Sequence, residues 1–265
     1  ELEAQGHRIT SLAGCSMGAL VGGIYAAGKL PEYREWMKSI NKRRIRELLD
    51  LSLSINHLVK GERIIEALME IVPDVAIEDL PIPYCAVATD WTSGREVIFR
   101  EGSLFQAIRA SISLPTVFNP VRRDGMILID GGVTNPLPLN RVVRHEGDRL
   151  GGVDVSGYDF EGASELQRER ENKRKTVRSL TKAILDKLTP DNIDFNYFTL
   201  LSRSSSIMLR QNSRLMTQLT QPDMLIDIQL QGIDGFDFDK SEHLIAIGHE
   251  EARKQLLHQA WDSIA

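Results

Sequence analysis

Runs of residues typical of β-strands alternate with helical runs along most of this chain. Strand patterns rich in Val, Ile, Thr and Tyr are predicted at 8–14, 82–91, 95–100, 125–130, 149–157 and 224–230. Helical patterns are predicted at 17–31, 32–50, 61–72, 104–113, 163–217 and in a closing helix that Asp239 and Glu242 cap. This alternation favours an α/β fold with a mostly parallel sheet that is covered on both faces. Because no repeat or low-complexity linker interrupts it, we expect a single domain over residues 1–265.

Ser103 and Gln106 form a capping box at the start of 104–113, and the strand at 149–157 is interpreted as buried. The closing helix has a stripe of apolar positions that recur every four residues: Leu244, Gly248, Ala252, Leu256 and Ala260.

Composition excludes several classes of function. The net charge of −5 argues against nucleic acid as a partner, because binding to phosphates requires a basic face. Two cysteines cannot form a disulfide framework, and Cys85 in the apolar run "PYCAVA" is interpreted as a small buried side chain. No stretch approaches the roughly 20 apolar residues that a membrane-spanning helix needs.

The pattern Gly14-x-Ser16-x-Gly18 lies between the first predicted strand and a helix rich in small residues. A nucleophile elbow requires this context, with glycines two residues before and after the serine to avoid collisions in a tight turn. The helix N-terminus beside the serine favours developing negative charge. The alternatives are a simple packing turn, or Cys15 as the nucleophile, although a side chain before the apex should point back into the protein.

A serine nucleophile needs a base within hydrogen-bond reach. The chain has six histidines, none of which is flanked by a tight glycine loop, and we interpret them as solvated: His7, His57, His145, His243, His249 and His258. Asp130 instead ends an apolar strand and is followed by Gly131 and Gly132. A carboxylate at the carboxyl end of a strand faces the crevice where α/β proteins bind ligands. We therefore pair Ser16 with Asp130 as a dyad without histidine.

These segments resemble the patatin-like phospholipase family, in particular its compact bacterial members. The resemblance rests on "GCSMGALVGGIYAAG", on the stretch from "LPIPYCAVATDW" to "SISLPTVFNPV", and on "LIDGGVTNPLP", in that order. It implies a three-layer α/β/α fold and hydrolysis of lipid acyl esters without a metal or other cofactor. Ser16 would be the nucleophile and Asp130 the base. The surrounding motif residues would support them and the oxyanion: Gly14, Met17, Gly18, Gly131 and Gly132.

The family carries a strand and a glycine-rich loop with an arginine before its nucleophile strand, and that loop supplies part of the oxyanion hole. The present sequence opens with "ELEAQGHRIT", which is interpreted as the end of a helix, so we expect that an upstream segment is absent. The N–H of Met17 or Gly18 would supply only part of the hole. Loss of one oxyanion donor raises the barrier by roughly 3–4 kcal/mol. A non-catalytic lipid-binding or regulatory module on the same fold is therefore the alternative function.

The expected substrate is a phospholipid, a lysophospholipid or a short ester. The stretch 38–49 carries five cationic residues beside apolar ones and could rest on anionic lipid, although a solvated amphipathic helix is the simpler interpretation. No signal peptide is visible, so we expect a cytoplasmic location unless an upstream segment carries a signal. Oligomeric state, acyl-chain preference and head-group preference cannot be predicted from these residues.

Overall fold

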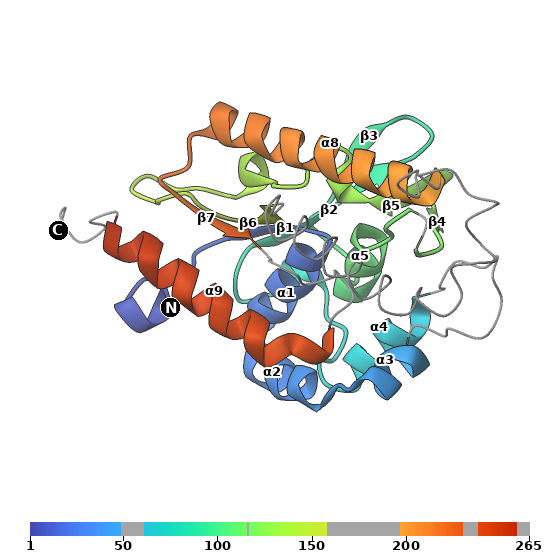
Figure 1. Ribbon diagram of the computed structural model, residues 1–265, viewed down its shortest axis with the longest axis horizontal. Coiled ribbons are helices and arrows are strands. Elements are labelled where there is room, and N and C mark those ends of the chain that lie inside the picture. The colour runs from blue at the N-terminus through green and yellow to red at the C-terminus, as the bar shows by residue number, and fades with distance from the viewer. Residues whose placement is uncertain (49–60, 116, 158–196, 230–237, 259–265) are drawn as a thin grey trace, which may run out of the picture.

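The computed structural model describes residues 1–48, 61–115, 117–157, 197–229 and 238–258 (Figure 1). The strands are β1 (Leu12–Cys15), β2 (Tyr84–Asp90), β3 (Arg95–Phe99), β4 (Val121–Arg123), β5 (Met126–Asp130), β6 (Gly151–Gly157) and β7 (Met224–Gln229). The α-helices are α1 (Met17–Ala26), α2 (Leu30–Ser39), α3 (Lys42–Leu48), α4 (Glu62–Met69), α5 (Leu104–Ser111), α8 (Tyr197–Thr220) and α9 (Ser241–His258). Short 3₁₀ turns include Gly131–Val133 and Leu139–Arg141.

The described strands form a mixed sheet of five and a parallel pair. In the five-stranded sheet β1 pairs with β2 in parallel, whereas the pairings of β2 with β3, of β2 with β5 and of β4 with β5 are antiparallel. Strands β6 and β7 pair in parallel. The α/β fold class is therefore confirmed, but the expectation of a mostly parallel sheet is wrong. Two of the antiparallel pairings arise at short turns, one between β2 and β3 and one between β4 and β5, because each turn reverses the direction of the chain.

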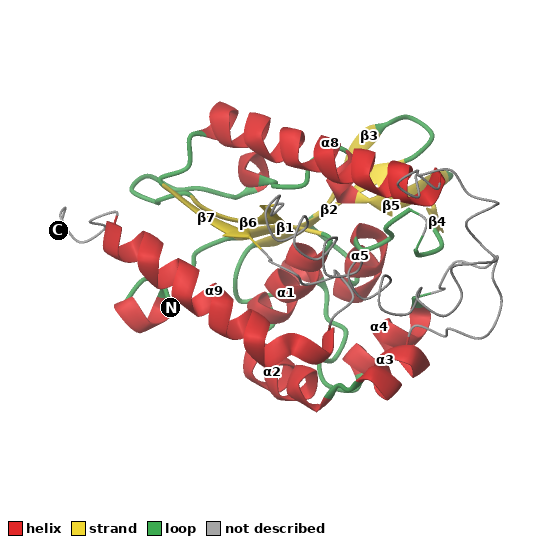
Figure 2. Cartoon of the chain, in the orientation of Figure 1, coloured by secondary structure: helices red, strands yellow, loops and turns green. Residues whose placement is uncertain are grey.

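Helices lie on both sides of the strands, which gives three layers (Figures 1 and 2). Helices α1, α2, α5 and α9 lie on one side, and the long helix α8 lies on the other. Strand β2 shows how the layers are held, because every one of its residues is buried. Ala86 and Ala88 join the cluster made with α1 and α5, whereas Cys85, Val87 and Thr89 meet the loop that follows β5.

Local capping explains where two helices begin. The Ser103 hydroxyl accepts a hydrogen bond from the Gln106 N–H at 3.0 Å, which caps the start of α5 as predicted. The predicted continuous helix over 32–50 is wrong, because it divides into α2 and α3. Ile40 is extended, and the Asn41 side chain accepts from the Arg44 N–H at 3.0 Å, so that it caps a new helix.

Two further expectations meet different outcomes near the C-terminal half. Strand β6 is not the buried strand we expected, because Val153 and Val155 are each more than half exposed. The predicted stripe on the closing helix is confirmed at Ala252 and Leu256, which pack against the buried side chains of β7. Ala260 and residues 163–196 of the helical region predicted at 163–217 lie outside the described residues.

None of the helices among the described residues has the length and the apolar content needed to cross a membrane. In the stretch 38–49 the apolar side chains of Ile40 and Leu48 are buried against Ala67. Arg43 and Arg44 both pair with Glu47. The amphipathic pattern of this stretch thus serves packing of α3 against α4, and its exposed side is charged.

Candidate active site

Ser16 lies at the apex of the turn between β1 and α1, with φ 52° and ψ −122°. A non-glycine residue in this region stores about 1–3 kcal/mol of strain, which the surrounding structure must hold. A Cβ on Gly14 would lie 2.4 Å from the backbone oxygen of Gly18, so only glycine fits there. A Cβ on Gly18 would meet nothing within 4 Å. The predicted steric need for glycine therefore holds before the serine and not after it.

Ser16 and Asp130 approach each other because two strands share one edge of β2. Strand β3 occupies one edge of β2 along Ala86–Asp90, so β1 and β5 must both pair with the other edge. There Cys15 of β1 pairs with Val87, and Asp130 of β5 pairs with the next residue, Ala88. Because β1 and β5 run in opposite directions, their carboxyl ends meet. We had expected Asp130 at the carboxyl edge of a parallel sheet, and the antiparallel pairing brings it to Ser16 by another route.

The Asp130 carboxyl group is 3% exposed and only half satisfied. Its Oδ1 accepts a hydrogen bond from the Gly132 N–H at 2.8 Å. Its Oδ2 is buried and has no hydrogen-bond partner among the described residues. Burial raises the pKa of Asp130, and the Ser16 hydroxyl and the Gly132 N–H oppose that rise. The result is a carboxyl group with a free oxygen and an increased proton affinity beside the Ser16 hydroxyl.

Ser111 is a site residue that the sequence analysis missed. Its hydroxyl accepts a hydrogen bond from the Ser16 N–H at 2.9 Å and donates one to the Val87 carbonyl at 2.6 Å. The side chain is fully buried at the last turn of α5. Ser111 thus ties the elbow to the strand on which Ser16 and Asp130 meet. The sequence did hold a signal for Ser111, since this serine lies on the apolar face of the predicted helix "LFQAIRAS". A polar side chain on a buried face normally makes hydrogen bonds.

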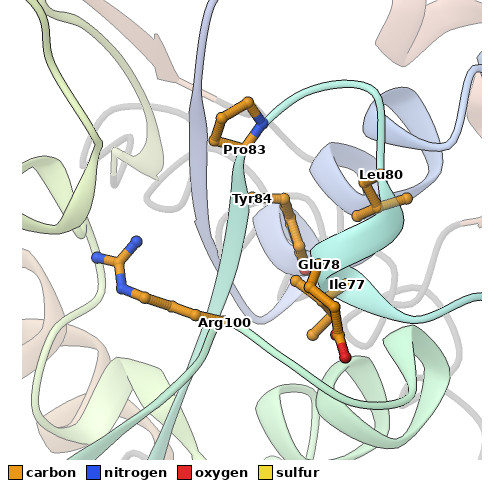
Figure 3. Close-up of a pocket in the computed structure, with 6 residues that line it drawn as sticks. All are labelled: Ile77, Glu78, Leu80, Pro83, Tyr84 and Arg100. Carbon is orange, nitrogen blue, oxygen red and sulfur yellow. The ribbon is translucent and has the colours of Figure 1, made fainter.

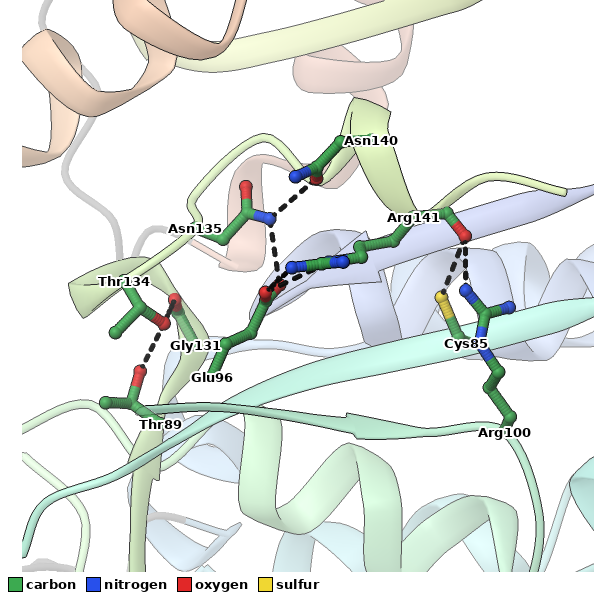
Figure 4. Close-up of polar contacts among 9 residues, drawn as sticks. All are labelled: Cys85, Thr89, Glu96, Arg100, Gly131, Thr134, Asn135, Asn140 and Arg141. Atoms are coloured by element: carbon green, nitrogen blue, oxygen red, sulfur yellow. Dashed lines mark hydrogen bonds and ion pairs between the residues drawn. The ribbon is translucent and has the colours of Figure 1, made fainter. Parts of the chain in front are cut away.

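The loop after Asp130 is held closely against β2. A Cβ on Gly131 would lie 2.1 Å from the Val87 carbonyl oxygen, so this approach requires glycine. A Cβ on Gly132 would lie 2.9 Å from a Leu209 methyl group of α8. Farther along, the Thr134 and Thr89 hydroxyls are 2.9 Å apart (Figure 4). These contacts fix the backbone that donates to Asp130.

A carboxylate on β3 holds the far end of the same loop. Glu96 forms an ion pair with Arg141 and accepts a hydrogen bond from the Asn135 amide at 2.8 Å (Figure 4). The same amide also donates to the Asn140 side chain at 3.0 Å. Arg100 donates to the Arg141 carbonyl oxygen at 2.7 Å. The loop is therefore anchored at both ends, which limits movement of Asp130.

Cys15 lies next to Ser16 but faces inward, and it is 8% exposed. Its thiol donates to the Asp130 Oδ1 at 3.8 Å. Burial, followed by the neighbouring Asp130 carboxyl group, raises the pKa of Cys15 well above its ordinary value. Because the thiolate is the nucleophilic form, Cys15 is a poor candidate for that role.

The donors at the start of α1 lie beside the Ser16 hydroxyl. The N–H groups of Met17 and Gly18 donate to no acceptor in the part of the chain that the structure describes. They lie at the positive end of the helix.

Among the histidines, His145, His243 and His249 are exposed, His7 is partly buried, and His57 and the side chain of His258 lie outside the described residues. Within the described ranges no group of three or more His, Cys, Asp or Glu could hold a metal ion.

Two cavities lie away from this pair of residues. One of about 230 Å³ opens where β2 begins, beside Pro83 and Tyr84 (Figure 3). It is lined by Ile77, Glu78, Leu80, Pro83, Tyr84 and Arg100. The other, of about 530 Å³, lies between α4, α5 and β4 and includes the Arg109 side chain. Neither cavity is lined by Ser16 or Asp130. The candidate site is therefore defined by the geometry of these two residues and not by a cavity.

Comparisons with known proteins point to one family. The family model described as Patatin-like phospholipase matches residues 1–143. Uncharacterized NTE family proteins of Mycobacterium tuberculosis and Mycobacterium bovis are 46% identical over 158 residues, which cover 60% of this chain and 44% of theirs. The neuropathy target esterase sws of Drosophila melanogaster is 31% identical over 165 residues, covering 60% of this chain and 12% of its own. The chain thus spans less than half the length of these curated relatives.

A search of solved structures finds VipD from Legionella pneumophila, whose crystal structure aligns with a TM-score of 0.44 and 14% identity. The alignment covers 97% of this chain and 63% of that chain.

Proposed function

The chain belongs to the patatin-like phospholipase family, and from that premise we propose that it is a serine acyl hydrolase acting on lipid carboxylic esters. Ser16 is the nucleophile and Asp130 the general base. The observation that carries this proposal is the buried, unpartnered Oδ2 of Asp130 beside the hydroxyl of a strained serine. A general base works best when its pKa lies near the working pH, and burial moves the pKa of Asp130 in that direction.

The proposed reaction proceeds through an acyl-enzyme. The Ser16 Oγ attacks the ester carbonyl carbon while its proton moves to the Asp130 carboxylate, and the carbonyl oxygen takes the negative charge. Collapse of this intermediate breaks the bond to the alcohol, which leaves with the proton from Asp130. Water then attacks the acyl group and gives a proton to Asp130. Release of the fatty acid returns that proton to the Ser16 oxygen.

The N–H groups of Met17 and Gly18 are the proposed donors to the oxyanion on the side of α1. Both are unpaired among the described residues and lie where the helix end is positive. The Ser16 N–H is already used in its bond to Ser111, so it does not contribute. Exposed apolar side chains lie on both sides of the site: Met17 follows Ser16, and Val133 lies in the turn after Asp130. An acyl chain is the substrate portion that such surroundings favour.

Covalent labelling tests the assignment of the nucleophile. A fluorophosphonate probe is expected to modify the full-length protein at Ser16, as peptide mass spectrometry would locate. The Ser16→Ala variant should lose the label, while Cys15→Ala, a change one residue away, should keep it. A label on Cys15 or on another serine would contradict the assignment. A protein that takes no label and hydrolyses no ester would instead be the non-catalytic lipid-binding module.

Ser111→Ala tests whether the buried serine positions the elbow. The change removes the bonds to the Ser16 N–H and to the Val87 carbonyl, so each of these backbone groups loses the Ser111 hydroxyl as a partner. We expect the free energy of unfolding to fall by about 2 kcal/mol. The kcat should fall by about tenfold to a hundredfold with little change in KM, because the nucleophile is displaced and binding is not.

Ser113→Ala is the matched control for this variant. Ser113 is equally buried and its hydroxyl also makes two hydrogen bonds, both to Arg109 at 2.7 and 2.8 Å. Its hydroxyl does not bond to the elbow. We therefore expect a comparable loss of stability, measured by urea unfolding, and a much smaller change in kcat. Equal changes of kcat in the two variants would show that Ser111 acts through stability alone.

A further inference from the structure

Cys15 carries a buried thiol that the proposed reaction does not use. It is the last residue of β1, immediately before the nucleophile, and its side chain is buried. The thiol donates a hydrogen bond to the Asp130 Oδ1 at 3.8 Å, across 115 residues of sequence. Two consecutive side chains, the Cys15 thiol and the Ser16 hydroxyl, therefore act on the same carboxyl group.

The two oxygens of the Asp130 carboxyl group have different surroundings. Oδ1 accepts from the Gly132 N–H at 2.8 Å and from the Cys15 thiol, whereas Oδ2 has no hydrogen-bond partner among the described residues. The two donors to Oδ1 come from different segments, the turn after β5 and the end of β1. A carboxyl group can rotate about the bond to its Cβ, and two donors on one oxygen oppose that rotation. Oδ2 thus stays available to the Ser16 hydroxyl.

The surroundings of Cys15 keep its thiol protonated. Burial and the Asp130 carboxyl group raise the pKa of Cys15 well above its ordinary value, and Glu96 of β3 adds to the rise. The thiol therefore remains a donor through the pH range in which Asp130 titrates. Its sulfur would lie 3.9 Å from a Cβ on Gly132, so it also lies close to the turn that supplies the other donor. These features suit Cys15 to donate to a carboxylate.

We propose that Cys15 is a positioning residue for the proposed base: its thiol holds Oδ1 of Asp130, so that Oδ2 is free to take the proton of Ser16. This role rests on the proposed function, in which Asp130 is the base. A donor to a carboxylate also favours the ionised form, so the contact keeps the base ionised at a lower pH than burial alone would allow. The groups that lower the pKa of Asp130 in this way are Ser16, Gly132 and Cys15.

The acid limb of the kcat/KM profile tests the contact. Cys15→Ala removes the thiol, which raises the pKa of Asp130, so the midpoint of the acid limb should move to higher pH by about 0.3–0.5 units. On the acid side of the midpoint kcat/KM then falls by about twofold to threefold. Cys15→Ser is as short as the alanine variant but keeps a donor, so its midpoint should move less. A midpoint that stays in place in Cys15→Ala, or moves equally in both variants, overturns the proposal.

Cys85→Ala is the matched control for the loss of a buried thiol. Cys85 is fully buried on β2, and its thiol donates to the Arg141 carbonyl oxygen at 3.7 Å and not to the base (Figure 4). Both alanine variants lose a sulfur atom and one weak hydrogen bond, so urea unfolding should show comparable losses of stability. The acid limb of Cys85→Ala should keep its midpoint. Equal shifts of the acid limb in the two variants would overturn the proposal, since lost packing alone would explain them.

The infrared S–H stretching band of Cys15 tests the same contact without catalysis. The chain has two cysteines, so the band is assigned by its absence from the spectrum of Cys15→Ala. A hydrogen bond to an ionised carboxylate is stronger than one to a neutral carboxyl group. The band should therefore move to lower wavenumber as the pH rises through the pKa of Asp130, and Asp130→Asn should abolish that movement.

This spectroscopic readout keeps the inference apart from the proposed function. A band that responds to pH through Asp130, in a protein that hydrolyses no ester, would contradict the proposed function and support the contact between the thiol and the carboxyl group. A band that does not respond to pH, or that responds equally in Asp130→Asn, overturns the inference even if the protein is an active esterase.

Discussion

Asp130→Asn is expected to lower kcat for ester hydrolysis by about 10⁴-fold while making the protein more resistant to heat at neutral pH. The activity is lost because asparagine cannot accept the proton of Ser16. The stability rises because a buried carboxylate with one unpartnered oxygen is replaced by a neutral group of the same shape. Many enzymes show this opposition between a strained site and the stability of the fold.

The stability gain expected for Asp130→Asn should depend on pH. The folded-state pKa of Asp130 is raised above its ordinary value by burial, so the folded protein binds the proton more tightly than the unfolded chain. The contribution of Asp130 to the free energy of unfolding is fully present below its pKa in the unfolded chain, and it is lost as the pH rises through its pKa in the folded protein. The gain in melting temperature for Asp130→Asn should therefore be largest above that raised pKa and vanish in acid. An equal gain at every pH would contradict the burial of an ionisable base.

The same shift predicts the acid limb of the activity profile. Only the ionised carboxylate accepts the Ser16 proton, so kcat/KM should fall as the pH drops through the raised pKa of Asp130. The midpoint of that fall should lie above 3.8, the ordinary value for an aspartic acid. A midpoint near 3.8 would mean that the base is a solvated carboxyl group elsewhere.

Gly14→Ala is expected to be the most damaging small substitution in the elbow. The added methyl carbon would lie 2.4 Å from the Gly18 oxygen and 2.6 Å from the Ala19 Cα, and both are backbone atoms that cannot turn aside. Relief requires opening of the turn that holds Ser16. We expect the free energy of unfolding to fall by about 3 kcal/mol, measured by urea denaturation, and ester hydrolysis to be lost.

Gly18→Ala is the matched control, four residues along the same turn. A methyl group there meets nothing within 4 Å, and alanine is a better helix former than glycine. Its stability should be unchanged or higher by about 0.5–1 kcal/mol. If Gly18→Ala were as unstable as Gly14→Ala, the tight approach at the elbow would not be the cause.

Local sequence signals predicted the parts of this molecule that depend on neighbouring residues. The apolar runs before Ser16 and before Asp130 predicted strands, and β1 and β5 are found there. The cap at Ser103 predicted the start of α5. The division of the helix at Asn41 was also readable in principle, since asparagine is a favoured cap, but the amphipathic pattern on both sides concealed it.

The sequence by itself determined the strand–turn–helix context of Ser16, the glycine required at position 14 and the likeness to the patatin-like phospholipases, because these depend on residues close together in the chain. Only the tertiary structure decided that β1 and β5 share one edge of β2 and run toward each other. It also decided that Ser111 bonds to the Ser16 backbone from 95 residues away. Strand register and direction arise from packing between distant segments, and the pattern within one strand does not specify its partner.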